Sequence, residues 1–177
     1  MGKVARTDER VELLKAPWRP GDGDYARKVN LAYRESAEPY LFLGADDLNF
    51  HEGWDTEALR FSDHGVVGTN DLHNPRVLAG RHSTHSLVSR RYADEYGIID
   101  GPGILCEKYS HQWVDDELVA TAQARGEFHF CAESVVEHLH PFFGLAERDA
   151  TYEKALAATR ADGAIFRSRR RLWARGR

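Results

Sequence analysis

Two adjacent carboxylates, Asp46 and Asp47, follow directly on the apolar run YLFL at residues 40–43. Apolar runs bounded by turn residues are typical of buried strands, so the two acids are expected at a strand end. Like charges there repel, and they are costly to remove from water unless a cation or hydrogen-bond donors meet them. The pair alone also fits an ordinary strand-to-turn segment, because aspartate favours turns.

Two further groups carry related chemistry: the acids Asp115, Asp116 and Glu117, and the histidines His138 and His140. Carboxylate oxygens suit Mg²⁺ or Mn²⁺, and one imidazole ligand favours Mn²⁺. Such a cation can neutralise a diphosphate leaving group while a separate carboxylate, Asp115 or Asp116, acts as general base. Each group also has a structural interpretation, with Asp115 as a helix N-cap and the histidines as ordinary strand residues.

Apolar periodicity predicts strands that alternate with helices along the chain. The strands are expected at 11–14, 40–43, 64–69, 86–88 and within 128–139. The helices are expected at 53–60, 90–96, 115–126, 151–161 and, capped by Asp24, across the apolar residues of 25–33 before Pro39. This order predicts an α/β layer fold with a mostly parallel sheet, in which ligands bind beyond the carboxyl ends of the strands. Asp46, Asp47 and His138 all lie at such predicted ends.

The 177 residues suit one domain, predicted over 1–177 with a basic C-terminal helix or tail at about 163–177. The net charge of -4 argues against a surface that binds nucleic acid throughout. Cys106 and Cys131 make no disulfide framework and are expected to be free and buried. The sequence shows no signal peptide and no membrane span, so we expect a cytoplasmic protein.

The run FLGADDLNFHEGW at 42–54 resembles the acidic metal motif of family 2 glycosyltransferases with the GT-A fold, where a strand ends in aspartates and Gly-Trp follows. HQWVDDEL at 111–118 resembles the later acidic motif, which supplies the catalytic base at a helix start. VVEHLHP at 135–141 resembles the segment with the metal-binding histidine. RKVNLAY at 27–33 is similar to the helix with an asparagine, and DATY at 149–152 fits small bacteriophage members.

The resemblance covers about residues 11–152 and implies a GT-A-like, Rossmann-like three-layer sandwich with a mostly parallel central sheet. It implies an enzyme that moves a sugar from a nucleotide-diphosphate donor to an acceptor hydroxyl on a DNA base, a protein or a glycan. Asp47 is implied as the chief ligand of Mn²⁺ or Mg²⁺, with His138 or else His140 beside it. Asp46 is implied to assist the metal or the ribose. Asp116, or its neighbour Asp115, is implied as the base of one inverting displacement.

Under this interpretation further residues are expected at the substrate: Arg19, Asn30, His73, Asn74, Arg76 and Trp113. Arg19 and the C-terminal arginines would meet the diphosphate, because a guanidinium group pairs well with phosphate oxygens. The loop at 71–81 would lie near the sugar or the acceptor. Trp113 would stack on a sugar ring or a base, or would instead pack as a hydrophobic staple before the helix. If the protein is phage-encoded, the expected compartment is the bacterial host cytoplasm.

The family normally begins with a strand that holds the nucleotide base, whereas only ten residues precede the strand predicted at 11–14. We therefore expect a sheet without the usual first strand, which a second copy or a partner chain can complete. Two other functions stay open. A metal-dependent hydrolase or nuclease would use the same ligands to activate water. A non-catalytic transferase fold would bind DNA or a partner chain through its arginines.

Overall fold

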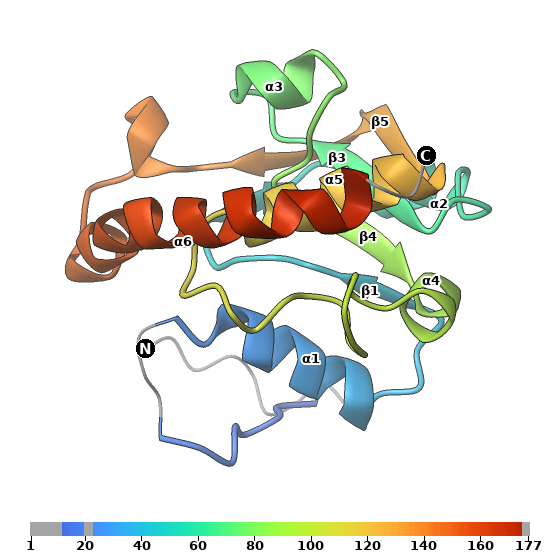
Figure 1. The fold of residues 1–177 in the computed structure, drawn as a ribbon. Coiled ribbons are helices and arrows are strands. Elements are labelled where there is room, and N and C mark those ends of the chain that lie inside the picture. The colour runs from blue at the N-terminus through green and yellow to red at the C-terminus, as the bar shows by residue number, and fades with distance from the viewer. Residues whose placement is uncertain (1–11, 20–22, 175–177) are drawn as a thin grey trace.

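Residues 12–19 and 23–174 are described by a computed structural model, shown as a ribbon in Figure 1. Its elements are α1 (Tyr25–Glu35), β1 (Tyr40–Phe42), β2 (Leu48–Phe50), α2 (Trp54–Leu59), β3 (Val66–Asn70), α3 (Pro75–Leu78), β4 (Ser86–Ser89), α4 (Arg90–Glu95), α5 (Val114–Arg125), β5 (Phe128–His138), the 3-10 helix η1 (Pro141–Phe143) and α6 (Ala150–Ala174). No helix in this part of the chain is long and apolar enough to cross a membrane.

Five strands form one sheet in the order β1-β4-β3-β5-β2. β3 and β5 run parallel, whereas the pairs β1–β4, β3–β4 and β2–β5 run antiparallel. The predicted mixture of helices and strands is confirmed, but the expectation of a mostly parallel sheet is wrong for the described strands. The reason is that β4 returns between β1 and β3 in the reverse direction, and the far half of the long strand β5 pairs with β2.

Helices cover both faces of this sheet, so its central strands are buried on each side. Val66 and Val88 pack into a core with α1, α4 and α5, while Val67 and Leu87 pack against Ala58 of α2. Successive residues of a strand point to opposite faces, which explains why neighbouring valines enter different cores. Figure 1 shows α6 as a long helix lying along α5, outside the first helix layer.

Several predicted elements differ from the observed ones at their ends. Residues 12–14 form no strand and are exposed, and Val11 lies outside the described residues. The helix predicted at 151–161 continues to Ala174, so the described part of the basic segment is helical. Trp113, not Asp115, occupies the N-cap position of α5, with a φ of 68°. Cys106 and Cys131 are free and buried, as predicted.

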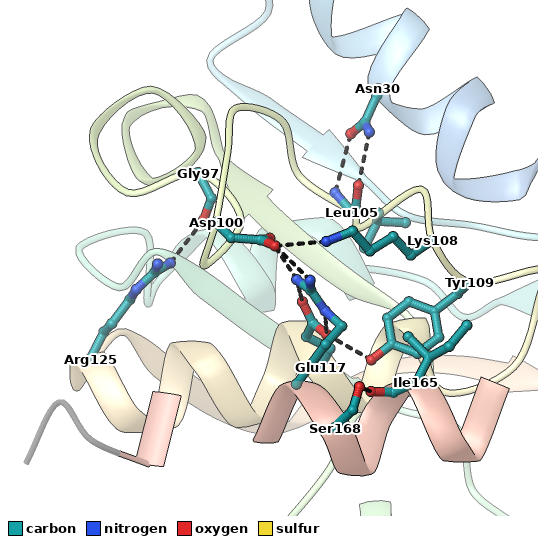
Figure 2. Close-up of polar contacts among 11 residues, drawn as sticks. Asn30, Gly97, Asp100, Leu105, Lys108, Tyr109, Glu117, Arg125, Ile165 and Ser168 are labelled. Atoms are coloured by element: carbon teal, nitrogen blue, oxygen red, sulfur yellow. Dashed lines mark hydrogen bonds and ion pairs between the residues drawn. The ribbon is translucent and has the colours of Figure 1, made fainter. Parts of the chain in front are cut away.

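A network of charges attaches α6 to α5, with Arg169 and Glu117 buried and Asp100 and Lys108 nearer the surface, as Figure 2 shows around Glu117, Asp100 and Tyr109. Arg169 of α6 donates to Glu117 at 2.7 and 2.6 Å and to Asp100 at 2.7 and 2.7 Å. The Tyr109 hydroxyl donates to Glu117 at 2.6 Å, and Lys108 lies 2.9 Å from Asp100. These bonds from Arg169, followed by Lys108, hold the pKa of Asp100 below its ordinary value, although burial opposes them. Arg169 is therefore a structural residue here and not a contact for a diphosphate.

Candidate functional site

One cavity of about 460 Å³ collects the acids and histidines singled out as metal and base residues, apart from Asp116. It lies where the loop after β1, the segment before β4, the start of α5, the end of β5 and the start of α6 meet. Its carboxylates are Asp46, Asp47, Asp115, Glu147 and Asp149, and its histidines are His85, His111, His138 and His140. No lysine or arginine of the described residues lines it, so the cavity attracts cations, and its volume is typical of a small-molecule site.

Asp47 and His138 meet in this cavity although 91 positions separate them. The pairing of β2 with β5 brings them together, because Leu48 lies opposite His138 in the register. His138 Nε2 donates to Asp47 Oδ2 at 3.1 Å. This hydrogen bond lowers the pKa of Asp47 against the opposing effect of burial. The other oxygen, Asp47 Oδ1, is buried without a hydrogen-bond partner.

His85, a residue that sequence reasoning missed, lines the same cavity directly before β4. Its Nδ1 lies 3.0 Å from the carbonyl oxygen of Leu43, which can only accept, so Nδ1 carries the proton and donates. Its Nε2 is buried and has no partner. Burial, with the nearby His138, lowers the pKa of His85 to about 4, so the ring is neutral at pH 7. The rings of His85 and His138 lie 4.7 Å apart between centroids.

His140 has the opposite arrangement of its ring nitrogens. The backbone N–H of Phe142 donates to His140 Nδ1 at 3.2 Å. Burial lowers the pKa of His140, which favours the neutral ring. A neutral ring that accepts at Nδ1 carries its proton on Nε2. His140 is therefore suited to donate a hydrogen bond into the cavity, whereas a metal ligand needs a free lone pair.

The two aspartates at the start of α5 have different surroundings. Asp115 lines the cavity, and its Oδ2 lies 3.2 Å from Nε2 of the buried His82. Burial would raise the pKa of Asp115, but the hydrogen bond and the charge of His82 outweigh it and lower that pKa. Asp116 does not line the cavity and pairs instead with Arg76 at 2.5 Å. Burial, followed by the charge of Asp115, raises the pKa of Asp116.

His82, Asp115 and Asp116 also form a group whose ligand atoms all lie within 4.8 Å of one another. Such a group can hold a cation in principle. However, Arg76 already compensates the charge of Asp116 and would repel a cation placed beside it. We therefore assign His82 the role of holding Asp115 in place and favouring its ionised form.

The wall of the cavity before α5 is fixed by one aspartate of α6. Asp162 is fully buried and accepts the backbone N–H groups of Ser110, His111 and Gln112 at 2.9, 2.9 and 2.8 Å. This clamp places His111 and Gln112 at the cavity. The chain then turns at Trp113 through a left-handed backbone conformation, which directs α5 and Asp115.

Trp113 itself belongs to the packing between α5 and α6. Its Nε1 donates to the carbonyl oxygen of Thr159 at 3.2 Å, and its ring lies 5.2 Å from that of Phe166. Trp113 does not line the cavity, so it is not placed to stack on a substrate there. Its position agrees with the alternative prediction that it packs against a helix. The loop residue His73 is likewise away from the cavity, where it contacts Glu137 at 3.2 Å.

The other expected substrate contacts also lie elsewhere. Asn30 is buried and bonds to the backbone of Leu105 and Ile104, and Figure 2 shows the bonds to Leu105. Asn74 caps α3 through the N–H of Arg76. Arg19 is exposed and does not line the cavity. Arg76 approaches the site only through Asp116. The structure thus gathers the predicted metal ligands and Asp115 in the cavity, but none of the six predicted substrate contacts, which are these four residues together with Trp113 and His73.

Comparison with known proteins gives no relative for this chain. No protein-family model matches the sequence. No curated protein matches it, and no solved structure matches its fold. The motif resemblance to family 2 glycosyltransferases therefore stays a prediction, and the residues of the cavity are the basis for the proposed chemistry.

Proposed function

We propose that the protein is a metal-dependent glycosyltransferase that moves a sugar from a nucleotide-diphosphate donor to an acceptor hydroxyl. The observation that carries the proposal is the convergence of Asp47, His138 and Asp115 in one cavity, from three segments far apart in the sequence. The lining holds five carboxylates and no lysine or arginine of the described residues. A diphosphate can enter such a cavity only together with a divalent cation, which is the requirement of this chemistry.

The residues after β1 would receive the donor. A bound Mn²⁺ or Mg²⁺ would neutralise the diphosphate as it leaves. Asp47 is the chief ligand in this proposal, with a histidine of the cavity beside it, for which the sequence suggested His138 or His140. The buried oxygen of Asp47 that lacks a donor fits this role. Asp46 is exposed at the rim, where it can meet the ribose or the cation.

Asp115 is the general base in this proposal, in preference to Asp116. It faces the cavity, and His82 favours its ionised form, so it can take the proton of the acceptor hydroxyl. The hydroxyl oxygen then bonds to the anomeric carbon as the carbon–oxygen bond to the diphosphate breaks, and the electron pair leaves with the diphosphate. One displacement of this kind inverts the anomeric configuration. Asp116 is occupied by Arg76.

Two features of the fold support the proposal: helices cover a mixed sheet on both faces, and the acids follow the end of β1. β1 lies at one edge of the sheet and pairs with β4 alone among the described strands. An open edge can pair with another strand. We propose that a second copy or a partner chain contributes to nucleotide binding at this side.

The test measures release of nucleoside diphosphate from a panel of sugar nucleotides in the presence of Mn²⁺. Asp115→Asn should lower turnover about 10²- to 10⁴-fold, which is the usual contribution of a general base. Thermal stabilisation by donor and Mn²⁺ together should persist in this variant. Asp116→Asn, the matched control on the same turn, should retain most of the turnover.

Two results would contradict the proposal. The first is the absence of stabilisation by any sugar nucleotide with Mn²⁺, and the second is normal turnover by Asp115→Asn. Stabilisation by the cation alone, accompanied by cleavage of phosphodiesters, would instead favour the hydrolase.

A further inference from the structure

Two buried atoms at the cavity, Asp47 Oδ1 and His85 Nε2, have no hydrogen-bond partner. The His85 residue is 6% exposed, so water does not readily replace the missing partner. Both residues line the same cavity, and His138 links them, since it bonds to Asp47 and its ring lies against His85. Two buried atoms of this kind at one cavity need an explanation.

Both atoms offer lone pairs and neither offers a proton. The Asp47 oxygen belongs to a carboxylate. In its ionised form a carboxylate has no proton to donate and can only accept. His85 Nδ1 donates to the Leu43 carbonyl oxygen, so the lone pair of the neutral ring lies on Nε2. Metal-bound histidines typically donate their second ring N–H to a backbone carbonyl in this way, which fixes the tautomer and the ring orientation.

The two histidines predicted as ligands, His138 and His140, are less suited to a cation in the observed arrangement. His138 Nε2 donates its proton to Asp47 Oδ2. His140 Nδ1 accepts from the backbone of Phe142, which leaves its proton on Nε2. A carboxylate that binds a metal through one oxygen is commonly held by a hydrogen bond on the other oxygen, and His138 supplies that bond.

We propose that His85 is a ligand of the divalent cation, binding through Nε2 beside Asp47 Oδ1, while His138 orients Asp47 from outside. In this assignment His85 takes the place of His138 and His140 as the histidine ligand. The assignment rests on the proposed function, which identifies the cavity as a metal site. Two protein ligands leave the remaining positions to phosphate oxygens and water, as is usual where a cation bridges protein and nucleotide. An imidazole nitrogen in the set favours Mn²⁺ over Mg²⁺.

The experiment uses the full chain, freed of metal by a chelator and titrated with Mn²⁺ alone, followed by electron paramagnetic resonance. Pulsed spectra of the bound ion should show coupling to a directly bound imidazole nitrogen. In His85→Ala this coupling should disappear, and the affinity for Mn²⁺ should fall about tenfold or more, as for loss of a residue at a metal site. The affinity for Mg²⁺, which prefers oxygen ligands, should fall much less.

Two variants serve as comparisons. His140→Ala removes a cavity histidine that we do not assign to the ion, so it should keep both the nitrogen coupling and the affinity. His64→Ala removes a histidine that does not line the cavity and should match the wild type. Asp116→Asn tests the group at His82, because loss of Mn²⁺ binding in this variant would place the ion there.

The outcomes are distinguishable. Wild-type protein that binds Mn²⁺ without nitrogen coupling overturns the assignment, even if His85→Ala fails to fold. Coupling that survives in His85→Ala but is lost in His140→Ala overturns it as well. Binding of Mn²⁺ with the predicted coupling, but without any stabilisation by sugar nucleotides, supports the ligand assignment and contradicts only the proposed function.

Discussion

Helix α5 carries acids into two charge clusters with opposite character. Glu117 joins the buried network with Arg169, Asp100 and Tyr109, where each carboxylate meets a donor. Asp115, two residues earlier, lies about 200° away around the helix and faces the cavity with Asp47. The carboxylates of the first cluster are balanced by Arg169 and Lys108, whereas the second cluster gathers carboxylates with no arginine or lysine of the described chain in its lining.

This difference in pairing distinguishes the charges that hold α6 to α5 from the charges assigned to the proposed site. Among the described residues, five buried side-chain atoms lack a partner, and three of them belong to Asp47, His82 and His85 at the cavity or its wall. None belongs to the Arg169 network. Unsatisfied buried polar atoms are unfavourable for folding, so their concentration in one place fits the proposed binding of a ligand that completes them.

The largest effect is expected from removing the guanidinium group of Arg169 from its network with Glu117 and Asp100. Arg169→Met would leave Glu117, whose side chain is 5% exposed, without its cation. Loss of one partner from a buried ion pair should lower the unfolding free energy by about 3–5 kcal/mol. Chemical denaturation measures this loss. Arg170→Met, at the exposed neighbouring position, should change it by less than about 0.5 kcal/mol. Equal losses in both variants would show that the network is not a stabilising unit.

A smaller effect is expected at the outer end of the same network. Asp100→Asn removes a charged acceptor of Arg169, so it should lower the unfolding free energy at neutral pH by about 1–3 kcal/mol. Because the pKa of Asp100 is lowered in the fold, its contribution is present above the unfolded value of about 3.9 and is lost as pH falls toward the folded value. Denaturation at neutral pH and at about pH 3 should therefore show a shrinking difference between variant and wild type. A difference that is constant with pH would exclude the charge as its cause.

The smallest effect should have the opposite sign, at Asp116, which lies beside the cavity cluster and next to Asp115. Burial and the charge of Asp115 raise the pKa of Asp116, so ionised Asp116 destabilises the fold. Asp116→Asn should raise the unfolding free energy at neutral pH by about 0.5–1 kcal/mol, because the lost partner Arg76 is half-exposed and contributes little. The gain should vanish below about pH 3.9, where the wild-type carboxyl is protonated in both states. A loss of stability at neutral pH would contradict the comparison.

Local patterns predicted where most helices and strands lie, but not the direction of the strands. In the run HGVVGT at 64–69 the central residues GVVG carry no polar side chain, which is typical of strands covered on both faces and hence of parallel sheets. β3 is indeed covered on both faces, yet it pairs antiparallel with β4. Burial of a strand on both faces depends on the helices that pack against it. The relative direction of two paired strands depends on the path of the chain between them, which no local pattern encodes.

The same missing information explains why His85 escapes notice in the sequence. An antiparallel β4 begins at the sheet edge where β1 ends, so the residue before it lies beside Leu43 and Asp47. In a parallel sheet that residue would lie at the far edge. Asp47 and His138 are predictable because their motifs end strands at the correct edge, while Asn30 is not, because its partners at 104–105 lie 74 and 75 positions away.

Asp162 has a consequence that reaches beyond the fold. Because a single side chain, 50 to 52 positions away, anchors three successive amides, the path of segment 110–112 does not depend on which side chains that segment carries. Positions 111 and 112 are therefore free to change identity at little cost to folding. Substitutions at these two positions can therefore change which molecule the cavity binds without altering the surrounding fold.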